Sequence, residues 1–337
     1  MNTVNINRRD LMTAGLVAAT GSLISFPTRA APLSMKVGLS APATHSSAVG
    51  LTAAATEIAK QTNGEVRLEV FPSGQLGSDQ SMIAQTRQGS LELYMGTASI
   101  LDGIVPNSAI WNTPFAFADY AAMWKAIDGQ VGAVVRNAAP RAGLKAFDTT
   151  WDNGFRQIST ANKPIAKVTD LKGLKVRVPV SAGLVMLFKA MNASPVALNF
   201  AELYPALQTK LVDGQENALS VFAIANFNEV QKYISMTNHV WDGYVPLTSV
   251  AFWKTIPADI QTIVANAING EAKKQRQVSE ALDKTLRATL AAKGVTFVDP
   301  DIAGFREHLR SVGFYKEWRE KVGEAAWTAL VPYAPGL

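Results

Sequence analysis

The chain has 337 residues, 32 of them basic and 27 acidic, and its net charge of +5 is too small to indicate a nucleic-acid-binding protein. It contains no cysteine, which excludes disulfides, thiol nucleophiles and thiolate metal sites. Its three histidines are too few and too scattered for a zinc site. We therefore expect neither a metal nor a cofactor.

The first 30 residues have the pattern of a bacterial export signal. Arg8 and Arg9 precede a modestly apolar stretch over residues 11–26, and small residues up to Ala30 suit a cleavage site. The paired arginines favour the twin-arginine export route. A membrane anchor is the alternative, but this stretch is shorter than the about 20 residues that span a bilayer. We expect cleavage near Ala30 and a folded protein in the periplasm.

The first part of the remaining chain alternates between strand and helix patterns. In residues 65–71, for example, Val66, Leu68 and Val70 occupy one face of a strand and charged residues the other. The pattern predicts strands over residues 33–40, 65–71 and 91–96, and helices over residues 46–61 and 78–88. Such alternation is typical of an α/β protein with a largely parallel sheet.

The alternation continues through the middle of the chain. It predicts helices over residues 118–135, 181–191 and 200–211, strands over residues 145–150, 174–180 and 218–221, and an extended apolar segment over residues 240–253. Asp152, followed by Asn153 and Gly154, has turn chemistry. The length beyond the leader exceeds what a single hydrophobic core usually supports, so we expect two lobes.

Residues 257–293 keep helical character without a break. A single helix of that length would be about 55 Å long, enough to run the length of a two-lobed protein. Two helices in a hairpin, with a bend at Gly270, are the alternative. The basic cluster at residues 273–276 has acidic neighbours at helical spacing and is predicted to be a solvated helix face.

No catalytic motif stands out in the sequence. Glycine-rich phosphate loops, nucleophile elbows and paired zinc-ligand histidines are all absent. Asp299 and Asp301 flank Pro300 and have the pattern of a polar loop with a helix cap. These observations favour a binding protein over an enzyme, and we expect no catalytic residues.

Arg177 is the most informative side chain of the chain beyond the leader. The alternation of Leu174, Val176 and Val178 directs these residues to a core and Arg177 to the opposite face. Arg177 lies near the carboxyl end of its strand, where open α/β sheets bind ligands. Its guanidinium can pair bidentately with a carboxylate. An ordinary surface arginine is the alternative.

Residues 170–179, DLKGLKVRVP, resemble the signature of the extracytoplasmic solute receptors of TRAP transporters, the DctP-type family. Three further segments resemble family motifs in the same order: residues 71–77, residues 154–156, and the run from 206 to 217 that ends in VDGQEN. The similarity covers essentially all of the chain beyond the leader.

The resemblance implies roles for individual residues. Arg177 matches the arginine that pairs with the solute carboxylate, Arg156 a second arginine that often reaches the solute, and Asn217 an asparagine that hydrogen-bonds it. A salt-bridged loop arginine is the alternative for Arg156. A turn residue after Asp213 and Gly214 is the alternative for Asn217. Phe200 matches an aromatic that packs on the solute, with a core position as its alternative.

Further candidates depend on position rather than on a motif. Thr97 and Ser40 follow strands of the first lobe, where family members place polar contacts. Trp151, Trp241 and Tyr244 are candidates to line the cleft, with core or inter-lobe packing as the alternative for each. The chain also departs from the family pattern: Lys210 stands where glycine is frequent, and Val180 where some relatives have a polar contact.

The resemblance implies a two-lobed periplasmic-binding-protein fold of α/β class. Each lobe would hold a mixed, mostly parallel sheet flanked by helices, and a long helix would cross both lobes. We expect lobe one to comprise residues 31–153 and about 245–280, and lobe two residues 154–244 and about 281–337.

The implied function is capture of a small organic or sugar carboxylate in the cleft between the lobes. The receptor, expected to be a monomer that binds no nucleic acid, would deliver this solute to the membrane subunits of a TRAP permease driven by an ion gradient. The alternatives are an exported enzyme acting on an organic acid and a sensor subunit with the same fold.

Overall fold

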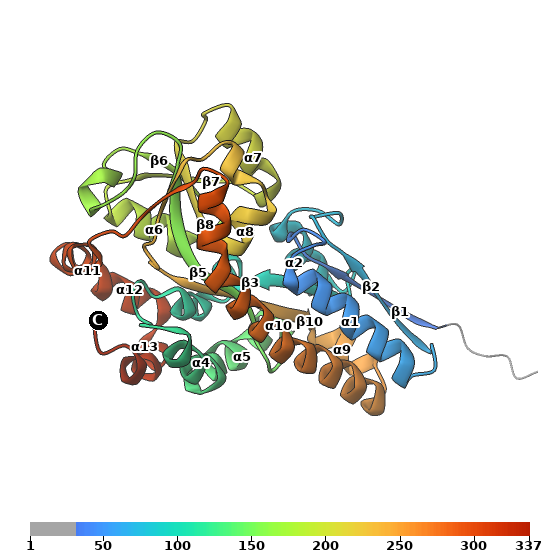
Figure 1. Cartoon of the computed structure of the whole chain (residues 1–337). Helices are drawn as coiled ribbons and strands as arrows, with labels where there is room; N and C mark the ends of the chain where they lie inside the picture. The colour runs from blue at the N-terminus through green and yellow to red at the C-terminus, as the bar shows by residue number, and fades with distance from the viewer. Residues whose placement is uncertain (1–31) are drawn as a thin grey trace, which may run out of the picture. The chain divides into compact units, whose positions relative to one another are not determined.

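The computed structural model describes residues 32–337, so the predicted export signal and its cleavage site lie outside the described residues. Strands and helices alternate along most of this range, and the fold is of α/β class with helices flanking a mixed sheet (Figure 1). None of the helices in residues 32–337 is both long enough and apolar enough to cross a membrane.

The described residues contain eleven strands that join into one sheet. The strands are β1 (Leu33–Gly38), β2 (Val66–Phe71), β3 (Leu93–Thr97), β4 (Leu144–Ala146), β5 (Trp151–Thr160), β6 (Lys175–Val178), β7 (Ser194–Ala197), β8 (Gly214–Ala218), β9 (Tyr233–Ser235), β10 (Trp241–Ser249) and β11 (Thr296–Val298). Their main order is β2-β1-β3-β10-β5-β8-β6-β7, with β4 paired to β10 and β9 paired to both β5 and β11.

Thirteen α-helices and five short 3₁₀ helices accompany the sheet within residues 32–337. The α-helices are α1 (Ser46–Gln61), α2 (Asp79–Gln88), α3 (Ala98–Leu101), α4 (Tyr120–Asp128), α5 (Gln130–Ala138), α6 (Ala182–Ala190), α7 (Phe200–Gln208), α8 (Leu219–Ile224), α9 (Val250–Thr255), α10 (Ala258–Ala292), α11 (Ile302–Ser311), α12 (Phe314–Val322) and α13 (Glu324–Leu330). The 3₁₀ helices are η1 (Pro106–Asn112), η2 (Ala139–Ala142), η3 (Val168–Leu171), η4 (Phe227–Glu229) and η5 (Val331–Tyr333).

Two long antiparallel strands in the middle of the sheet join its two parallel parts. On one side β1 pairs in parallel with β2 and β3, and on the other β6 pairs in parallel with β7 and β8. Strand β10 pairs with β3 through residues 244–248 and with β5 through residues 241–244, and β5 continues along β8. Both parts of the sheet therefore depend on β5 and β10 for their connection.

Helix α10 is continuous over 35 residues, so the helical-hairpin alternative is wrong. Near its start, Val264 and Ile268 belong to a hydrophobic cluster with α1 and strands β1 to β3. Near its end, Leu286 and Leu290 belong to a different cluster, with α7, α8 and β9. The helix runs beside both regions in Figure 1 and so contributes to two separate cores.

Strand β5 was not predicted, because all ten of its residues are buried and they show no alternation of apolar and polar side chains. The predicted strand over residues 145–150 is only the short β4, and Asp152 lies within β5 rather than in a turn. Asp152 has no exposed surface, and its Oδ1 accepts a hydrogen bond of 2.8 Å from the Trp241 indole.

Three other predicted elements divide or change type within their predicted range. The extended segment expected over residues 240–253 is β10 only as far as Ser249, and α9 begins at Val250. The helix expected over residues 118–135 is divided at Gly129 into α4 and α5. The strand expected over residues 218–221 is wrong, because β8 ends at Ala218 and the residues after it form α8. Strand β8 escaped prediction because its buried sequence, GQENA, is mostly polar.

The basic cluster at residues 273–276 is only partly solvated. Lys274 is exposed and forms an ion pair with Glu271. Gln275 is buried and forms a reciprocal pair of hydrogen bonds, 2.8 and 2.9 Å long, with the backbone of Asp152. Arg276 donates to the Thr150 carbonyl and stacks 3.7 Å from the centre of the Trp124 ring. These side chains fasten α10 to the start of β5.

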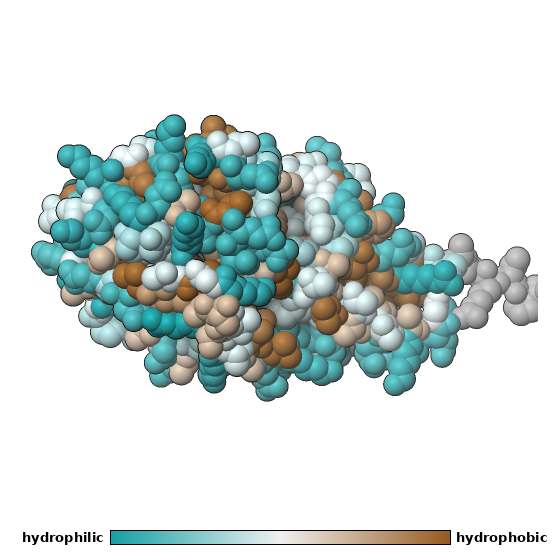
Figure 2. All heavy atoms as spheres, turned by 45° about the horizontal axis from the view of Figure 1, so that its top comes forward, coloured by the Kyte–Doolittle hydropathy of each residue, from teal (hydrophilic) through white to brown (hydrophobic). Residues whose placement is uncertain are grey.

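Hydrophilic residues predominate on the face shown in Figure 2, and apolar residues form separate patches among them. The exposed large apolar residues include Val49 on α1 and Val278 and Leu282 on α10. All three also line a groove between these helices and α8.

Replacing Gly270 with alanine is expected to stabilise the protein, because Gly270 lies inside a continuous helix with nothing within 4 Å of the added Cβ. Alanine in a helix interior is favoured over glycine by about 0.5–1 kcal/mol. Urea unfolding measures the gain. Gly64→Ala is the matched control: its Cβ also has open space, but its φ of +78° disfavours alanine, so this variant should lose stability. A loss of stability in Gly270→Ala would contradict a continuous α10.

Asp152 is expected to make stability depend on pH. Burial raises its pKa to about 6, although hydrogen bonds from Ser279 and Trp241 act in the opposite direction. The folded protein therefore holds the Asp152 proton more tightly than the unfolded chain, and the resulting stabilisation, complete below about pH 4, is lost as the pH rises through about 6.

We expect Asp152→Asn to be more stable than the wild type at pH 7.5, by up to about 3 kcal/mol, and to match it more closely at pH 4.5. The asparagine can still accept the Trp241 hydrogen bond. Urea unfolding at the two pH values measures the difference, with the exposed Asp148→Asn as control. An equal pH dependence of wild type and Asp152→Asn would show that Asp152 does not titrate in this range.

Candidate functional site

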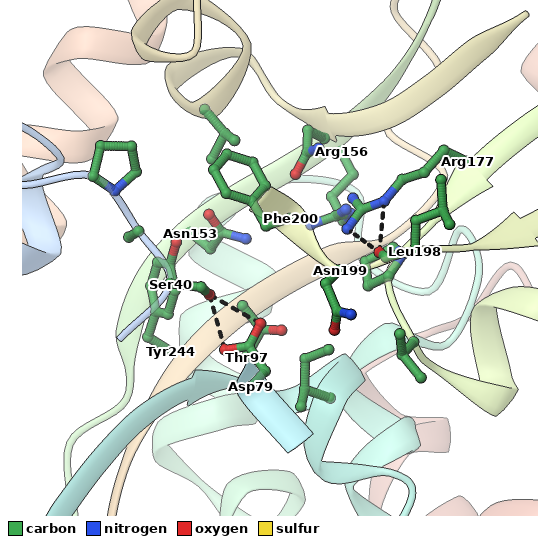
Figure 3. Close-up of a pocket in the computed structure, with 17 residues that line it drawn as sticks. Ser40, Asp79, Thr97, Asn153, Arg156, Arg177, Leu198, Asn199, Phe200 and Tyr244 are labelled. Atoms are coloured by element: carbon green, nitrogen blue, oxygen red, sulfur yellow. Dashed lines mark hydrogen bonds between the residues drawn. The ribbon is translucent and has the colours of Figure 1, made fainter. Parts of the chain in front are cut away.

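One pocket collects polar side chains from the ends of several strands. Ser40 follows β1, Thr97 ends β3, Arg177 lies near the end of β6 and Asn217 near the end of β8. Parallel strands of an open α/β sheet present their carboxyl ends to ligands in this way. The pocket is lined by residues from both parallel parts of the sheet (Figure 3).

Six of the eight residues predicted from the sequence line this pocket: Arg177, Asn217, Arg156, Phe200, Thr97 and Ser40. Tyr244, which was left open between cleft and core, lines it as well. The residues are far apart in the sequence, and the central strands β5 and β10, together with the parallel strands beside them, bring them together.

Arg177 extends from β6 into the pocket, while its neighbours Val176 and Val178 are buried in a hydrophobic cluster, as the alternation predicts. Its Nε and Nη2 donate hydrogen bonds of 3.0 and 2.6 Å to the Leu198 carbonyl, as Figure 3 shows. Within residues 32–337, Nη1 has no hydrogen-bond partner. The Leu198 carbonyl therefore orients the guanidinium through its Nε and Nη2 edge, and Nη1 remains free to donate hydrogen bonds.

The charge of Arg177 is only weakly compensated. Burial lowers its pKa to about 10, and the nearby Arg156 lowers it too, while Glu216 and Asp79 act in the opposite direction. A pKa of about 10 leaves the guanidinium protonated at neutral pH. A buried cation with free donor capacity can stabilise an anion strongly, because little water competes for it.

Arg156 is bound within the protein. Its Nη2 donates to Oε1 and to the backbone carbonyl of Glu216 at 2.7 and 2.8 Å, and its Nη1 lies 3.7 Å from Oδ2 of Asp242. Burial opposes ionisation of Glu216, but the adjacent Arg156 lowers the Glu216 pKa below its usual value. Arg156 thus lines the pocket with a charge that Glu216 already neutralises.

His239 completes this buried network without adding a charge. Its Nε2 lies 3.2 Å from Oε2 of Glu216, and burial lowers the His239 pKa. The ring is therefore neutral at physiological pH and donates from Nε2 to the carboxylate.

Asn217 and Phe200 complete the wall around Arg177. The Asn217 amide donates 2.6 Å to Oε1 of Gln215, which holds the side chain in place within the buried strand β8. Phe200 is the first residue of α7, whose start is fixed by a capping box between Asn199 and Glu202. Phe200 also contacts the Phe227 ring, with 6.3 Å between ring centres.

Asp79 faces the same pocket and was missed by the sequence analysis. Ser40 donates to both of its carboxylate oxygens, at 2.8 and 2.9 Å, and the Tyr94 hydroxyl donates to Oδ1 at 2.8 Å. Burial raises the Asp79 pKa, although these hydrogen bonds and Arg177 oppose the shift. In the sequence Asp79 is the first residue after the Ser78 helix cap, where an acidic residue is ordinary.

Trp151 and Trp241 do not line the pocket, because both are core residues. Trp151 is fully buried and packs against α1, where a Cβ on Gly50 would lie 2.4 Å from its ring. Trp241 packs against the rings of Trp111 and Trp124. Both tryptophans begin a central strand on its core side, which the sequence pattern of a fully buried strand does not reveal.

A wider groove adjoins the pocket on one side. The two share Ser40, Pro42, Asp79, Asn199 and Phe200, and the groove adds residues of the turn before α2 and of α7. Phe200 therefore stands where the inner pocket meets the outer groove.

The chain matches the family model described as bacterial extracellular solute-binding protein, family 7, over residues 37–321. It is 32% identical to the C4-dicarboxylate-binding periplasmic protein DctP of Rhodobacter capsulatus, covering 80% of this chain and 82% of that protein. It is 29% identical to the 2,3-diketo-L-gulonate-binding periplasmic protein YiaO of Escherichia coli, covering 89% of each.

Solved structures show the same likeness. A TRAP periplasmic solute-binding protein from Sulfurospirillum deleyianum with bound succinate has a TM-score of 0.83 and 29% identity, covering 89% of this chain and 98% of that one. The sugar-acid-binding protein DctPAm from Advenella mimigardefordensis, in complex with galactonate, has a TM-score of 0.85 and 26% identity, covering 90% and 98%.

Proposed function

Because the chain belongs to family 7 of the bacterial extracellular solute-binding proteins, the receptors of TRAP transporters, we propose that it captures a small hydroxylated carboxylate in the pocket around Arg177. The observation that carries this proposal is the buried Arg177, whose Nη1 has no hydrogen-bond partner in the described part of the chain. The Leu198 carbonyl occupies the Nε edge, so the solute carboxylate meets the guanidinium from its Nη1 side.

Asp79 supports a solute with hydroxyl groups rather than a second carboxylate. It lies across the pocket from Arg177 in Figure 3, and its oxygens can accept a hydrogen bond from a solute hydroxyl. A second carboxylate at this position would face the carboxylate of Asp79, and like charges in a buried site repel strongly. Thr97, Asn153 and Tyr244 add polar groups suited to further hydroxyls.

The sheet topology supports a two-lobed mechanism. In our proposal lobe one comprises residues 31–153 and about 245–280, lobe two residues 154–244 and about 281–337, and strands β5 and β10 and helix α10 connect them. The carboxylate docks on Arg177 of lobe two, and contacts with Asp79 and Ser40 of lobe one favour closure. Helices α12 and α13 of the proposed lobe two pack on η1 and α5 of lobe one, so in this proposal they lie at the contact between the lobes.

We further propose the cellular setting. The leader is removed near Ala30, and the receptor works as a monomer in the periplasm, where it delivers its solute to the membrane subunits of a TRAP permease. It binds no nucleic acid and returns the acid chemically unchanged. Mass spectrometry of the acid after incubation with the protein tests this last point, because an enzyme would convert it.

Arg177→Ala is expected to lose solute affinity while the protein still folds. A thermal-shift panel of galactonate, D-erythronate, galacturonate and succinate identifies an acid that stabilises the wild type. Calorimetry with that acid should show a loss of about 2–5 kcal/mol of binding free energy in the variant. Arg87→Ala is the matched control, since Arg87 also donates from Nε to a backbone carbonyl but lies on α2 outside the pocket. Equal affinity of Arg177→Ala and wild type would refute the assignment.

Asp79→Asn is expected to change the preference among acids. Galactonate affinity should fall about tenfold, because a charge-assisted hydrogen bond is lost, while succinate should bind as well as before or better. Calorimetry with both acids measures the ratio, and the exposed Asp119→Asn serves as control. A parallel fall for both acids would indicate a structural role for Asp79 instead.

A further inference from the structure

Asp102 is a buried carboxylate that does not line the pocket yet lies directly behind its wall. It follows α3 and is 3% exposed. Its Oδ2 accepts hydrogen bonds from the backbone N–H of Gly183 at 2.8 Å and from the Ser181 hydroxyl at 3.0 Å. Both donors lie at the start of α6, 79 and 81 residues away in the sequence. Asp102 therefore connects two distant parts of the chain.

The chemistry of this contact is favourable for a strong interaction. The first N–H groups of a helix have no partner within the helix and carry the positive end of its dipole, which stabilises a carboxylate. The Lys321 ammonium on α12 lies 3.7 Å from the same oxygen and adds a full positive charge. Burial excludes water that would otherwise compete for these groups.

Gly183 permits the close approach. A Cβ at this position would lie 2.9 Å from Oδ2 of Asp102 and 2.9 Å from the Trp318 ring, closer than real Cβ contacts. A side chain on this residue would therefore push α3 and α6 apart.

All side-chain partners of Asp102 in residues 32–337 come from outside its own part of the chain. Ser181 is the N-cap of α6 and Gly183 lies in its first turn, while Lys321 belongs to α12. A local helix cap would instead bond to its own helix, as Asp119 does with Ala122 at the start of α4. The Asp102 side chain thus connects the end of α3 to α6 and α12 rather than serving as a local side-chain cap.

The contact joins the two walls of the pocket. Ile100, two residues before Asp102, lines the pocket from the side of β3. Pro179 and Val180, just before Ser181, line it from the side of β6. Strands β3 and β6 are separated in the sheet by β10, β5 and β8, so no backbone pairing ties these two walls to each other.

We propose that Asp102 is a latch that holds the pocket closed over the solute, by pairing with the start of α6 when the lobes come together. It is a positioning residue that touches no solute, and the inference rests on the proposed two-lobed function. Because the latch contributes only to the closed state, its loss increases the open population and speeds solute release.

Spin labels can measure this opening directly, since the chain has no native cysteine. The substitutions Lys60→Cys on α1 and Lys172→Cys before β6, both at exposed positions, carry the labels in the full chain. Pulsed dipolar spectroscopy then gives the distance distribution with and without an equimolar mixture of succinate, D-erythronate and galactonate.

In Asp102→Asn, we expect a larger long-distance population without acids and about a tenfold higher half-saturating concentration of the mixture. Lys321→Gln should also increase the long-distance population and the half-saturating concentration, but by less than Asp102→Asn does. Asp119→Asn, which removes the same charge at a local helix cap, should behave as wild type. Urea unfolding monitors the stability of each variant, because a purely structural role would lower stability without changing the distances of the folded protein.

The outcomes separate the two proposals. If the acids leave wild-type distances unchanged, the proposed solute class is wrong, and the distributions without acids still test the latch. The latch is overturned if Asp102→Asn and the wild type give the same distance distributions without acids. Where the mixture binds, they must also share the same half-saturating concentration. A larger open population in Asp102→Asn but not in Asp119→Asn supports it.

Discussion

The buried ion pair between Arg156 and Glu216 is the interaction on which the rest of the site depends. It joins β5 to β8 across their shared ladder, with Glu216 fully buried and Arg156 2% exposed. Removing one partner of such a pair leaves an uncompensated buried charge, which commonly costs about 3–5 kcal/mol. Because Glu216 neutralises Arg156, the pocket can hold a second arginine beside it without two uncompensated cations repelling each other.

The pairing with Glu216 also gives the two arginines different roles. Arg156 lines the pocket but makes three hydrogen bonds to Glu216, whereas Arg177 is oriented only by the Leu198 carbonyl and keeps donor capacity toward the pocket. The sequence alone presents both as candidates to contact the solute carboxylate. Their different roles follow from which carboxylates the fold places beside them, and Asp79 and Glu216 both come from elements distant in sequence.

The burial of the strands explains which sequence predictions were incomplete. Arg177 could be recognised because β6 keeps alternation, with Val176 and Val178 in the core. Strands β5 and β10, buried along their whole lengths, give no such signal. Trp151 and Trp241 belong to these strands. Without alternation in the sequence, nothing indicated that both side chains point into the core rather than into the cleft. Asp79 was missed for another reason. An acidic residue in the first turn of a helix is explained by the helix dipole alone, so its position gave no sign of a binding role.

The sequence by itself determined the α/β class, the helical character of residues 257–293, the family and the arginine that faces the pocket, because these depend on local periodicity and on contiguous motifs. The tertiary structure decided what surrounds that arginine. Glu216, Asp79, Asp242 and Asp102 act through partners far away in the chain, and their pairing depends on how β5, β10 and α10 bring the two parallel parts of the sheet together. Burial strengthens each of these pairings, and burial is a property of the folded chain rather than of any segment of it.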